Sequence, residues 1–414
     1  MVGGNRSPAF DPARVTRRPR LLFVQPSLQP PGGGNGVAAW MLQALKDDYD
    51  VTVYTWWPVD VEKINRFWGT SLRADDFRAT RVPTWLRRLV DAPPLPLAML
   101  RTAVMLNSVR RRLVDYDIAV TANNEADFGT IGVQYVHYPW NMFPRPAVDL
   151  RWYHFGFLLA PYYRLCVGLS GFSADSMRRN VSLVNSDWTG RQAWTRYQMA
   201  SRTVYPPVTN EASPVPWEAR TPDFVCVGRL APEKELERVL ELMTAVRASF
   251  GATRLHVVGT SDNDRYYRTI VRRLRAAGDW VQLHENLSRA ELLALIGRVR
   301  YGIHGMREEH FGMAPAEMVR AGCIVWVPDG GGQVEIVGDK RLTYGSIEDA
   351  VAKIAGTLRD PEEQARLRAH LATRAPLFST ERFVQQVRAA VAEAAQGAAA
   401  ASSRKPASRA SSSS

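Results

Sequence analysis

Two glutamates, Glu309 and Glu317, stand eight positions apart and enclose a glycine, small residues and a proline. The apolar run 299–303 before them has strand character, and a helix is predicted from Pro315 to Arg320 because proline suits a first helical turn. In open α/β sheets ligands bind beyond the carboxyl ends of the strands, and the free N–H groups of a helix start attract phosphate. The spacing therefore predicts a site with a carboxylate at each end and an anion between them.

A second candidate site lies in the segment 228–234. Gly228 ends a predicted strand and Pro232 opens a helix, so that Arg229 and Lys234 flank the helix start. A guanidinium, an ammonium and free N–H groups together suit a diphosphate. Taken alone, the two basic side chains could equally form a surface pair.

The glycine-rich segment 32–36 lies between a predicted strand and a helix predicted from about Val37 to Lys46. Its glycines would bring backbone N–H groups close to a ligand, and a purely structural role is the alternative. The segment matches the dinucleotide fingerprint only in its letters, because six residues separate the strand from the first glycine. The next strand also lacks the acidic residue that would hold a ribose.

His137 follows a predicted strand and stands two positions before Pro139, which ends that strand. We expect it near the cleft, where it can donate to a sugar hydroxyl or a phosphate, and a packed histidine is the alternative. Other polar residues are predicted to have structural roles. The segment 262–264 is predicted to be a turn rather than a metal site, and His256 is predicted to lie in the core. His284 and His304 are predicted to pack rather than to line the cleft.

Composition limits the classes of protein. The chain has 414 residues, of which 46% are hydrophobic and 23% charged, enough for two globular domains. Its net charge of +12 favours an anionic partner. The three cysteines lie far apart, which indicates reduced, buried thiols in a cytosolic protein. The apolar runs 95–106 and 155–169 each contain an arginine and are too short for a membrane span, and no secretory signal is visible.

Short apolar runs alternate with predicted helices, which indicates an α/β fold with mostly parallel sheets. The predicted strands are 21–25, 51–54, 118–120, 131–136 and 181–184 before a proline-rich linker at 206–217, and 224–227, 255–258, 281–283, 301–303 and 324–327 after it. The pattern indicates two doubly wound domains with a cleft between them. A last helix is predicted from about Thr380 to Ala395.

Taken together, these motifs resemble those of glycosyltransferase family 4. The resemblance rests on Gly228-Arg229, Pro232-Glu233-Lys234 and Glu309-x-Phe311-Gly312 with Glu317, and it covers about residues 20–395. Within the family, residues 32–34, 135–139, 184–189 with 204–207, and 309–312 are most similar to the enzymes that add α-1,2-mannose to the dolichol-linked oligosaccharide. The resemblance implies the GT-B fold, in which two Rossmann-like domains face each other across a cleft.

The resemblance also implies a role for each matched residue. Arg229 and Lys234 would bind the donor diphosphate and stabilise it as the leaving group, with Gly228 beside them. Glu309 would hold hydroxyls of the transferred sugar, and Glu317 would hold the ribose. The remaining expected donor contacts are backbone N–H groups of Phe311, Gly312, Met313 and Ala314, the base-binding backbone from Leu283 to Leu287, His137 beside the sugar, and Gly33 and Gly34 closing over the donor.

The expected division of the chain has five parts. Residues 1–19 form a flexible basic leader, and residues 20–207 form the acceptor-side domain. Residues 208–378 form the domain that binds the nucleotide sugar. Residues 379–396 form a helix that packs back on the N-terminal domain, and residues 397–414 form a disordered Ala/Ser-rich tail.

We therefore expect a retaining, metal-independent glycosyltransferase that needs no cofactor. It would move a hexose, with mannose expected, from a nucleotide-diphosphate sugar such as GDP-mannose to a glycan or lipid-linked acceptor. The alternatives are another GT-B enzyme, namely a phosphorylase or a sugar-nucleotide epimerase, and a non-catalytic subunit that binds nucleotide sugars. No nucleic acid partner is expected. The expected location is cytoplasmic, with peripheral contact to an anionic membrane through residues 85–112, or with that segment packed inside its domain.

Overall fold

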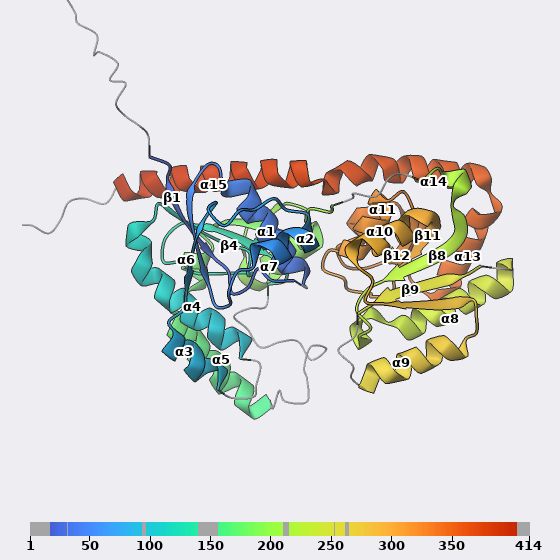
Figure 1. Cartoon of the computed structure of the whole chain (residues 1–414), viewed down its shortest axis with the longest axis horizontal. Coiled ribbons are helices and arrows are strands. Elements are labelled where there is room, and N and C mark those ends of the chain that lie inside the picture. Colours follow the sequence, from blue (N-terminus) through green and yellow to red (C-terminus); the bar gives the residue numbers. More distant parts are fainter. Residues whose placement is uncertain are drawn as a thin grey trace, which may run out of the picture.

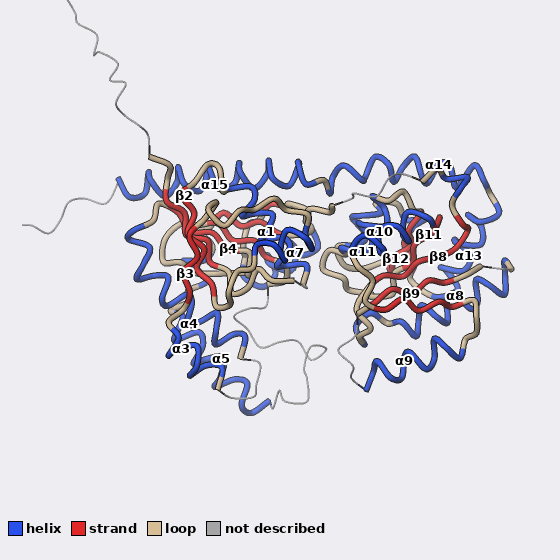
Figure 2. Tube along the Cα trace, in the orientation of Figure 1, coloured by secondary structure: helices blue, strands red, loops and turns tan. Residues whose placement is uncertain are grey.

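The computed structural model describes residues 17–30, 32–92, 97–139, 156–209, 215–251, 253–260 and 265–403. Two α/β domains lie end to end along the long axis of the molecule, and the C-terminal helix runs along one edge (Figure 1). Helices surround a sheet in each domain (Figure 2). The prediction of two doubly wound domains is confirmed.

The N-terminal domain contains a parallel sheet of seven strands in the order β3-β2-β1-β4-β5-β6-β7. Its strands are β1 (Arg20–Val24), β2 (Asp50–Thr55), β3 (Arg78–Arg81), β4 (Ile118–Thr121), β5 (Val133–Val136), β6 (Val181–Val184) and β7 (Arg202–Thr203). The central strands are continuous apolar runs because both of their faces are covered. Residues 21–24, for example, are all buried.

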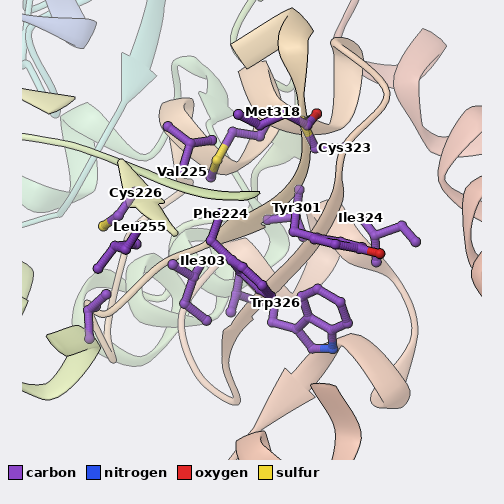
Figure 3. Close-up of a cluster of buried hydrophobic side chains, with 14 of the residues drawn as sticks. Phe224, Val225, Cys226, Leu255, Tyr301, Ile303, Met318, Cys323, Ile324 and Trp326 are labelled. Carbon is purple, nitrogen blue, oxygen red and sulfur yellow. The ribbon is translucent and has the colours of Figure 1, made fainter. Parts of the chain in front are cut away.

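The C-terminal domain contains a parallel sheet of six strands in the order β10-β9-β8-β11-β12-β13. Its strands are β8 (Thr221–Val227), β9 (Leu255–Gly259), β10 (Val281–Glu285), β11 (Val299–Ile303), β12 (Ile324–Pro328) and β13 (Thr343–Tyr344). Phe224, Tyr301 and Trp326 pack with tilted rings in its core, on three adjacent strands (Figure 3). The strands β8 and β11 are neighbours, so loops that follow them emerge at one edge of the sheet.

Helices connect the strands. Those of the N-terminal domain are α1 (Gly33–Leu45), α2 (Val61–Trp68), α3 (Thr84–Asp91), α4 (Ala98–Arg112), α5 (Gly156–Ser170), α6 (Ala174–Met177) and α7 (Asp187–Tyr197). Those of the C-terminal domain are α8 (Leu236–Phe250), α9 (Arg265–Ala276), α10 (Arg289–Arg298), α11 (Met313–Arg320), α12 (Gln333–Val337), α13 (Ile347–Arg359) and α14 (Pro361–Arg374), and α15 (Thr380–Ser403) follows them. The predicted capping box at Ser288 is present, and Asp360 caps α14.

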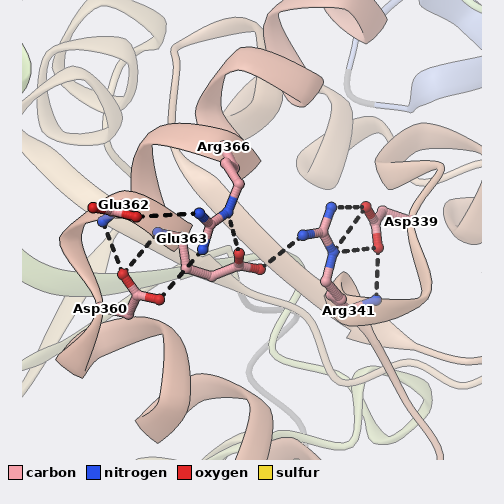
Figure 4. A network of polar contacts seen from close by, with 6 residues as sticks. All are labelled: Asp339, Arg341, Asp360, Glu362, Glu363 and Arg366. Atoms are coloured by element: carbon pink, nitrogen blue, oxygen red, sulfur yellow. Dashed lines mark hydrogen bonds and ion pairs between the residues drawn. The ribbon is translucent and has the colours of Figure 1, made fainter.

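An ion-pair network braces the start of α14. Arg366 contacts Asp360 and Glu363, and Glu363 also accepts a hydrogen bond from Arg341, which pairs with Asp339 (Figure 4). Exposed pairs contribute little singly. The network nevertheless joins two segments that flank the last strand of the sheet.

The helix α15 packs on the N-terminal domain, as predicted. Its residues Phe383, Val387, Ala390, Val391 and Ala394 recur at helical spacing and are buried in that domain's core. The Nε atom of Arg388 donates to the carbonyl oxygen of Ala44 on α1 at 2.7 Å. The helix therefore ties the end of the chain to the opposite domain.

Four details of the fold differ from the predictions. The helix α1 begins at Gly33 rather than near Val37, and α11 begins at Met313 rather than Pro315. The helix α15 continues to Ser403, where a disordered tail was expected. The strands β3, β7 and β13 were not predicted. The leader up to residue 16, the end of the tail and the turn at 262–264 lie outside the described residues.

The cysteines Cys166, Cys226 and Cys323 are buried and free. No helix within the described ranges is both long and apolar enough to cross a bilayer.

Candidate active site

The carboxylate of Glu309 lies at the centre of the candidate site, in the loop between β11 and α11. The Nζ atom of Lys234 is 2.5 Å from Oε2 of Glu309, and Nε2 of His304 is 3.2 Å from the same oxygen. Lys234 follows β8, and His304 follows β11 directly. The carboxyl ends of two neighbouring strands thus bring the three side chains together, at the edge where α/β sheets bind ligands.

Lys234, Glu309 and His304 determine each other's protonation state. Burial opposes ionisation of Glu309, but the hydrogen bond from His304 and the positive charge of Lys234 hold its pKa well below the usual range. Burial lowers the pKa of His304, and the Lys234 charge adds to this effect against the influence of Glu309. At neutral pH the site therefore holds an ionised carboxylate and a neutral imidazole that donates to it. Glu308, by contrast, is exposed, so the structure favours Glu309 of the two adjacent glutamates.

The start of α11 follows Glu309 within four residues. Gly312 is the N-cap at φ 106°, a conformation that suits glycine, and no side chain caps the helix. The first N–H groups of α11, at Met313 and Ala314, are therefore oriented as in an anion site. Phe311 itself is buried against Tyr205 and Phe378, so only its backbone is available for the predicted donor contact.

Glu317 lies one turn further along α11. Its Oε1 atom is 2.6 Å from Nη1 of Arg289, and Nη2 of Arg289 donates to the carbonyl oxygen of Thr209 at 3.0 Å. Glu317 and Arg289 both line a cavity of about 310 Å³ between the domains, together with Gly33, Gly228 and Met313 among others. Four of the predicted donor-binding residues thus share one cavity.

The glycine-rich start of α1 faces this site from the N-terminal domain. A Cβ atom on Gly33 would lie 3.5 Å from Cγ of Met313 on α11, and one on Gly34 would lie 3.1 Å from Nε2 of His137. The starts of α1 and α11 therefore approach each other across the domain boundary.

His137 lies beside α1, but its Nε2 atom is engaged. It is 3.0 Å from the carbonyl oxygen of Ala122, to which it can only donate. Burial lowers the pKa of His137 to about 4, and His310 adds to this effect against the Ala122 bond. His137 is therefore neutral, and in this conformation its Nε2–H is not available to a sugar.

Two predicted residues lie apart from the cluster in this conformation. Arg229 is 56% exposed and pairs with Glu233 at 2.5 Å, so the predicted contact with a diphosphate requires its side chain to turn. Leu283 packs against the core and does not line the cavity, whereas Leu287, at the other end of the predicted base-binding segment, does.

The sequence reasoning missed the contacts that join the two domains. Glu335 on α12 accepts hydrogen bonds from the backbone N–H groups of Asp187 and Trp188, each at 2.8 Å, and from the Tyr205 hydroxyl at 3.2 Å. It therefore caps a helix of the other domain. The glycine-rich segment 329–332, which directly precedes α12, was the only local sequence signal for this role.

His310, the unassigned position between Glu309 and Phe311, was given no role from the sequence. Its ring stacks on Tyr138 with centroids 4.0 Å apart and lies near-parallel to Trp188 at 5.7 Å. His304 and Arg289 were also missed as partners of Glu309 and Glu317. A histidine beside a buried strand and an arginine at a helix start are both common, so neither residue type was a signal.

Comparisons with known proteins agree with this geometry. Residues 209–373 match the family of glycosyl transferases group 1. The chain is similar to the GDP-Man:Man(3)GlcNAc(2)-PP-Dol alpha-1,2-mannosyltransferase of Candida glabrata, with 27% identity over 163 residues that cover 35% of this chain and 32% of the relative. The Homo sapiens protein of the same name is 27% identical over 240 residues, which cover 52% and 48%. The matches thus span less than half the length of these relatives.

Solved structures share the whole architecture. Anabaena HepE in complex with UDP has a TM-score of 0.63 at 14% identity, covering 90% of this chain and all of that one. Sucrose-phosphate synthase from Thermosynechococcus elongatus has a TM-score of 0.64 at 15% identity, covering 92% of this chain and all of that one. The resemblance to glycosyltransferase family 4 and its mannosyltransferase subgroup is confirmed. Residues 209–373 in the C-terminal domain thus match the glycosyl transferases group 1 family model, and the two domains together have the GT-B fold.

Proposed function

We propose that the chain is a retaining, metal-independent glycosyltransferase that moves mannose from GDP-mannose to a glycan or lipid-linked glycan. The observation that carries the proposal is the cluster of Lys234, Glu309 and His304 at the carboxyl edge of the C-terminal sheet, beside the start of α11. A cation, an anion and free N–H groups in one place fit a ligand that has a diphosphate at one end and sugar hydroxyls at the other.

The chemistry follows from where charge grows during the reaction. When the bond between the sugar and the diphosphate breaks, negative charge develops on the leaving oxygens. Lys234 and the N–H groups at the start of α11 would stabilise that charge, which is the main way that such sites lower a barrier. Arg229, after turning from Glu233, would add a second cation. These groups supply the charge that a metal ion would otherwise supply, which supports metal independence.

Glu309 would hold the sugar. Because its pKa is well below the usual range, it is an acceptor for two hydroxyl groups at neutral pH. The hydrogen bond from Nε2 of His304 holds this carboxylate in place. We propose retention by attack of the acceptor on the face from which the diphosphate leaves, with Gly33, Gly34 and His137 bordering that face and Glu317 on the ribose.

The identity of the sugar and the base is supported by the relatives. All four curated proteins reported as similar carry the name GDP-Man:Man(3)GlcNAc(2)-PP-Dol alpha-1,2-mannosyltransferase. We therefore propose GDP-mannose as the donor and a lipid-linked glycan as the acceptor. No cofactor is needed, because the donor carries its own leaving group.

A lipid-linked acceptor would be reached at a membrane surface on the cytoplasmic side. The segment proposed to contact the membrane divides into two helices with different roles. The helix α4 packs inward, with Met99, Ala103 and Leu106 buried, as the alternative reading of that segment expected. The helix α3 instead exposes Trp85 by 69% and Leu89 by 65%, with the exposed Arg88 between them. An apolar helix face with a basic residue suits an anionic bilayer.

The first test is a thermal-shift series with GDP-mannose, GDP, UDP-glucose and ADP-glucose. Only the matching nucleotide should raise the melting temperature, because a ligand that binds the folded state alone stabilises it. The second test is transfer from GDP-mannose to a mannosylated lipid diphosphate by wild type and Glu309→Ala, with and without EDTA. The variant should bind GDP and lose transfer, EDTA should have no effect, and the product should be the α-anomer.

The alternatives give different results. A phosphorylase would need phosphate to cleave a glycan, and an epimerase would interconvert free nucleotide sugars without an acceptor. A non-catalytic subunit would bind GDP-mannose but show no wild-type transfer. If no nucleotide sugar shifts the melting temperature, the proposed function is wrong.

A further inference from the structure

The cavity between the domains has two unlike walls. Its C-terminal wall contains the pair of Glu317 and Arg289, the strand-end residues Gly228, Gly259 and Thr260, and apolar side chains that include Leu287, Leu292 and Met313. Its N-terminal wall is formed by the start of α1, at Gly33 and Gly36, and by the apolar side chains of Val37 and Trp40 on α1 and of Phe67 and Trp68 at the end of α2. We call the three rings of Trp40, Phe67 and Trp68 the aromatic roof. The charged groups of the cavity thus come from the C-terminal domain alone, and the N-terminal domain offers the ligand aromatic and apolar side chains.

The roof is built to hold its rings in place. A Cβ atom on Gly36 would lie 2.7 Å from Cε3 of Trp68, so the absence of a side chain on α1 is what admits this ring. Nε1 of Trp40 donates to the carbonyl oxygen of Trp68 at 3.0 Å. The ring of Phe67 packs edge-on against that of Trp68, with centroids 4.6 Å apart. These contacts hold the rings of the roof in fixed positions before a ligand binds.

One polar atom of the roof lacks a partner. Nε1 of Trp68 is buried and has no hydrogen-bond acceptor among the described residues. A buried indole N–H nearly always has an acceptor, because leaving it unpaired costs free energy. A ligand acceptor in the adjoining cavity would supply one.

We propose that the aromatic roof binds the nucleobase of the donor and determines which base is accepted. The base would lie against the rings of Phe67 and Trp40 and accept a hydrogen bond from Nε1 of Trp68. The ribose would then reach Glu317, and the diphosphate would reach Gly228, beside which Lys234 lies. The order of groups along the donor thus matches the order along the cavity. The planar base meets the aromatic roof, the ribose hydroxyls meet a carboxylate, and the diphosphate meets a cation.

This inference rests on the proposed function, since it assigns part of the same donor. It adds that the N-terminal domain, not only the nucleotide-binding domain, reads the base. Binding of the nucleotide would consequently hold the two domains together, because the base contacts one and the ribose the other.

The test measures GDP binding by titration calorimetry to wild type, Phe67→Ala, Trp68→Phe and the control Phe250→Ala. Phe67 is 41% exposed and Phe250, at the end of α8, is 39% exposed, so the two truncations are matched in type and burial. We expect the dissociation constant to rise about fivefold for Phe67→Ala and a similar amount for Trp68→Phe, which keeps a ring but removes the donor. Phe250→Ala should bind as wild type does.

Inorganic diphosphate provides the second arm, as a competitor that displaces GDP. It has no base, so its own affinity should be the same for wild type and Phe67→Ala. The inference is overturned if wild type binds GDP and both roof variants bind it equally well, or if both lose diphosphate affinity in the same proportion. If wild type binds no nucleoside diphosphate at all, the proposed function fails first and this inference with it.

Discussion

The hydroxyl group of Ser186 in the N-terminal domain donates a hydrogen bond to the carbonyl oxygen of His310 in the C-terminal domain, at 2.6 Å. The same Oγ accepts a hydrogen bond from the backbone N–H of Thr189 at 3.1 Å and so caps α7. His310 directly follows Glu309. The contact therefore fixes the peptide next to the site carboxylate from the opposite domain, and Ser186 is a positioning residue.

Replacing Ser186 with alanine should lower kcat for transfer roughly tenfold, or about 1.4 kcal/mol, because Glu309 is less well placed. The dissociation constant of GDP should change little, since Ser186 does not line the cavity. The control is Ser173→Ala, which removes the N-cap of α6 without touching the other domain. Equal losses of kcat in both variants would show that only helix capping matters.

Variants of the pair of Lys234 and Glu309 should affect folding stability and transfer activity differently. Lys234→Met leaves Glu309 ionised and partly buried without its cation, which should lower the free energy of unfolding by about 1–3 kcal/mol. The double variant Lys234→Met with Glu309→Gln removes both charges and should recover much of that loss. Transfer should stay at least about a hundredfold below wild type in both, since Lys234 stabilises the leaving group. Denaturant titration and transfer assays on the same preparations measure the two effects. Transfer that recovers together with stability would contradict a catalytic role for Lys234.

The same pair should make the protein sensitive to acid. The pKa of Glu309 is lower in the folded state than the value of about 4.3 expected in the unfolded chain. The folded state therefore binds this proton less readily, so the pair stabilises the fold above about pH 4 and loses that contribution as the pH falls further. The difference in unfolding free energy between wild type and Glu309→Gln should shrink between pH 6 and pH 3. A difference that is constant over this range would mean that Glu309 does not titrate as its surroundings require.

The elements that carry the site could be predicted because their signals are local. A buried parallel strand is a run of apolar residues, so β8 and β11 and the loops after them were placed from the sequence. The strand β3 was not, because all four of its residues are exposed, and β7 and β13 are too short to form a pattern. The start of α1 was missed because glycine is a weak helix former, and tertiary packing of the helix overrides that preference.

The contacts of the site could be predicted only in part. From the residues alone, Glu309 and Lys234 belonged to two separate candidate sites, and only the family resemblance assigned them to one donor site. The engagement of His137 with Ala122, of Arg229 with Glu233 and of Ser186 with His310 depends on side-chain rotamers and on how two domains meet. Sequence spacing contains no information on either, since those partners are remote or oriented by the packing around them.

Glu335 should couple the two domains. Its carboxylate accepts two backbone hydrogen bonds at the start of α7, where a negative charge is also favoured by the helix dipole. Glu335→Ala should lower the free energy of unfolding by about 2 kcal/mol and reduce kcat, because the two domains lose a shared anchor. The control is Glu393→Ala, which breaks an exposed pair with Arg202 and should cost less than about 1 kcal/mol. Small-angle scattering should show a larger radius of gyration for Glu335→Ala alone, and an unchanged radius would argue against the coupling.

The exposed face of α3 should govern contact with membranes. Trp85 and Leu89 stand one helical turn apart and are 69% and 65% exposed, so a charged residue there should cost little folding stability. Trp85→Glu should reduce binding to vesicles of phosphatidylcholine with anionic phosphatidylglycerol at least about fivefold, because it removes an interfacial aromatic and adds repulsion. Trp194→Glu on α7 is the control, since Trp194 is another exposed tryptophan of the same domain, at 54%. Cosedimentation measures the binding, and transfer to a water-soluble acceptor should be unchanged in both variants. If both tryptophan variants bind the vesicles equally, general charge rather than α3 draws the protein to the surface, because a specific docking face must distinguish the two positions.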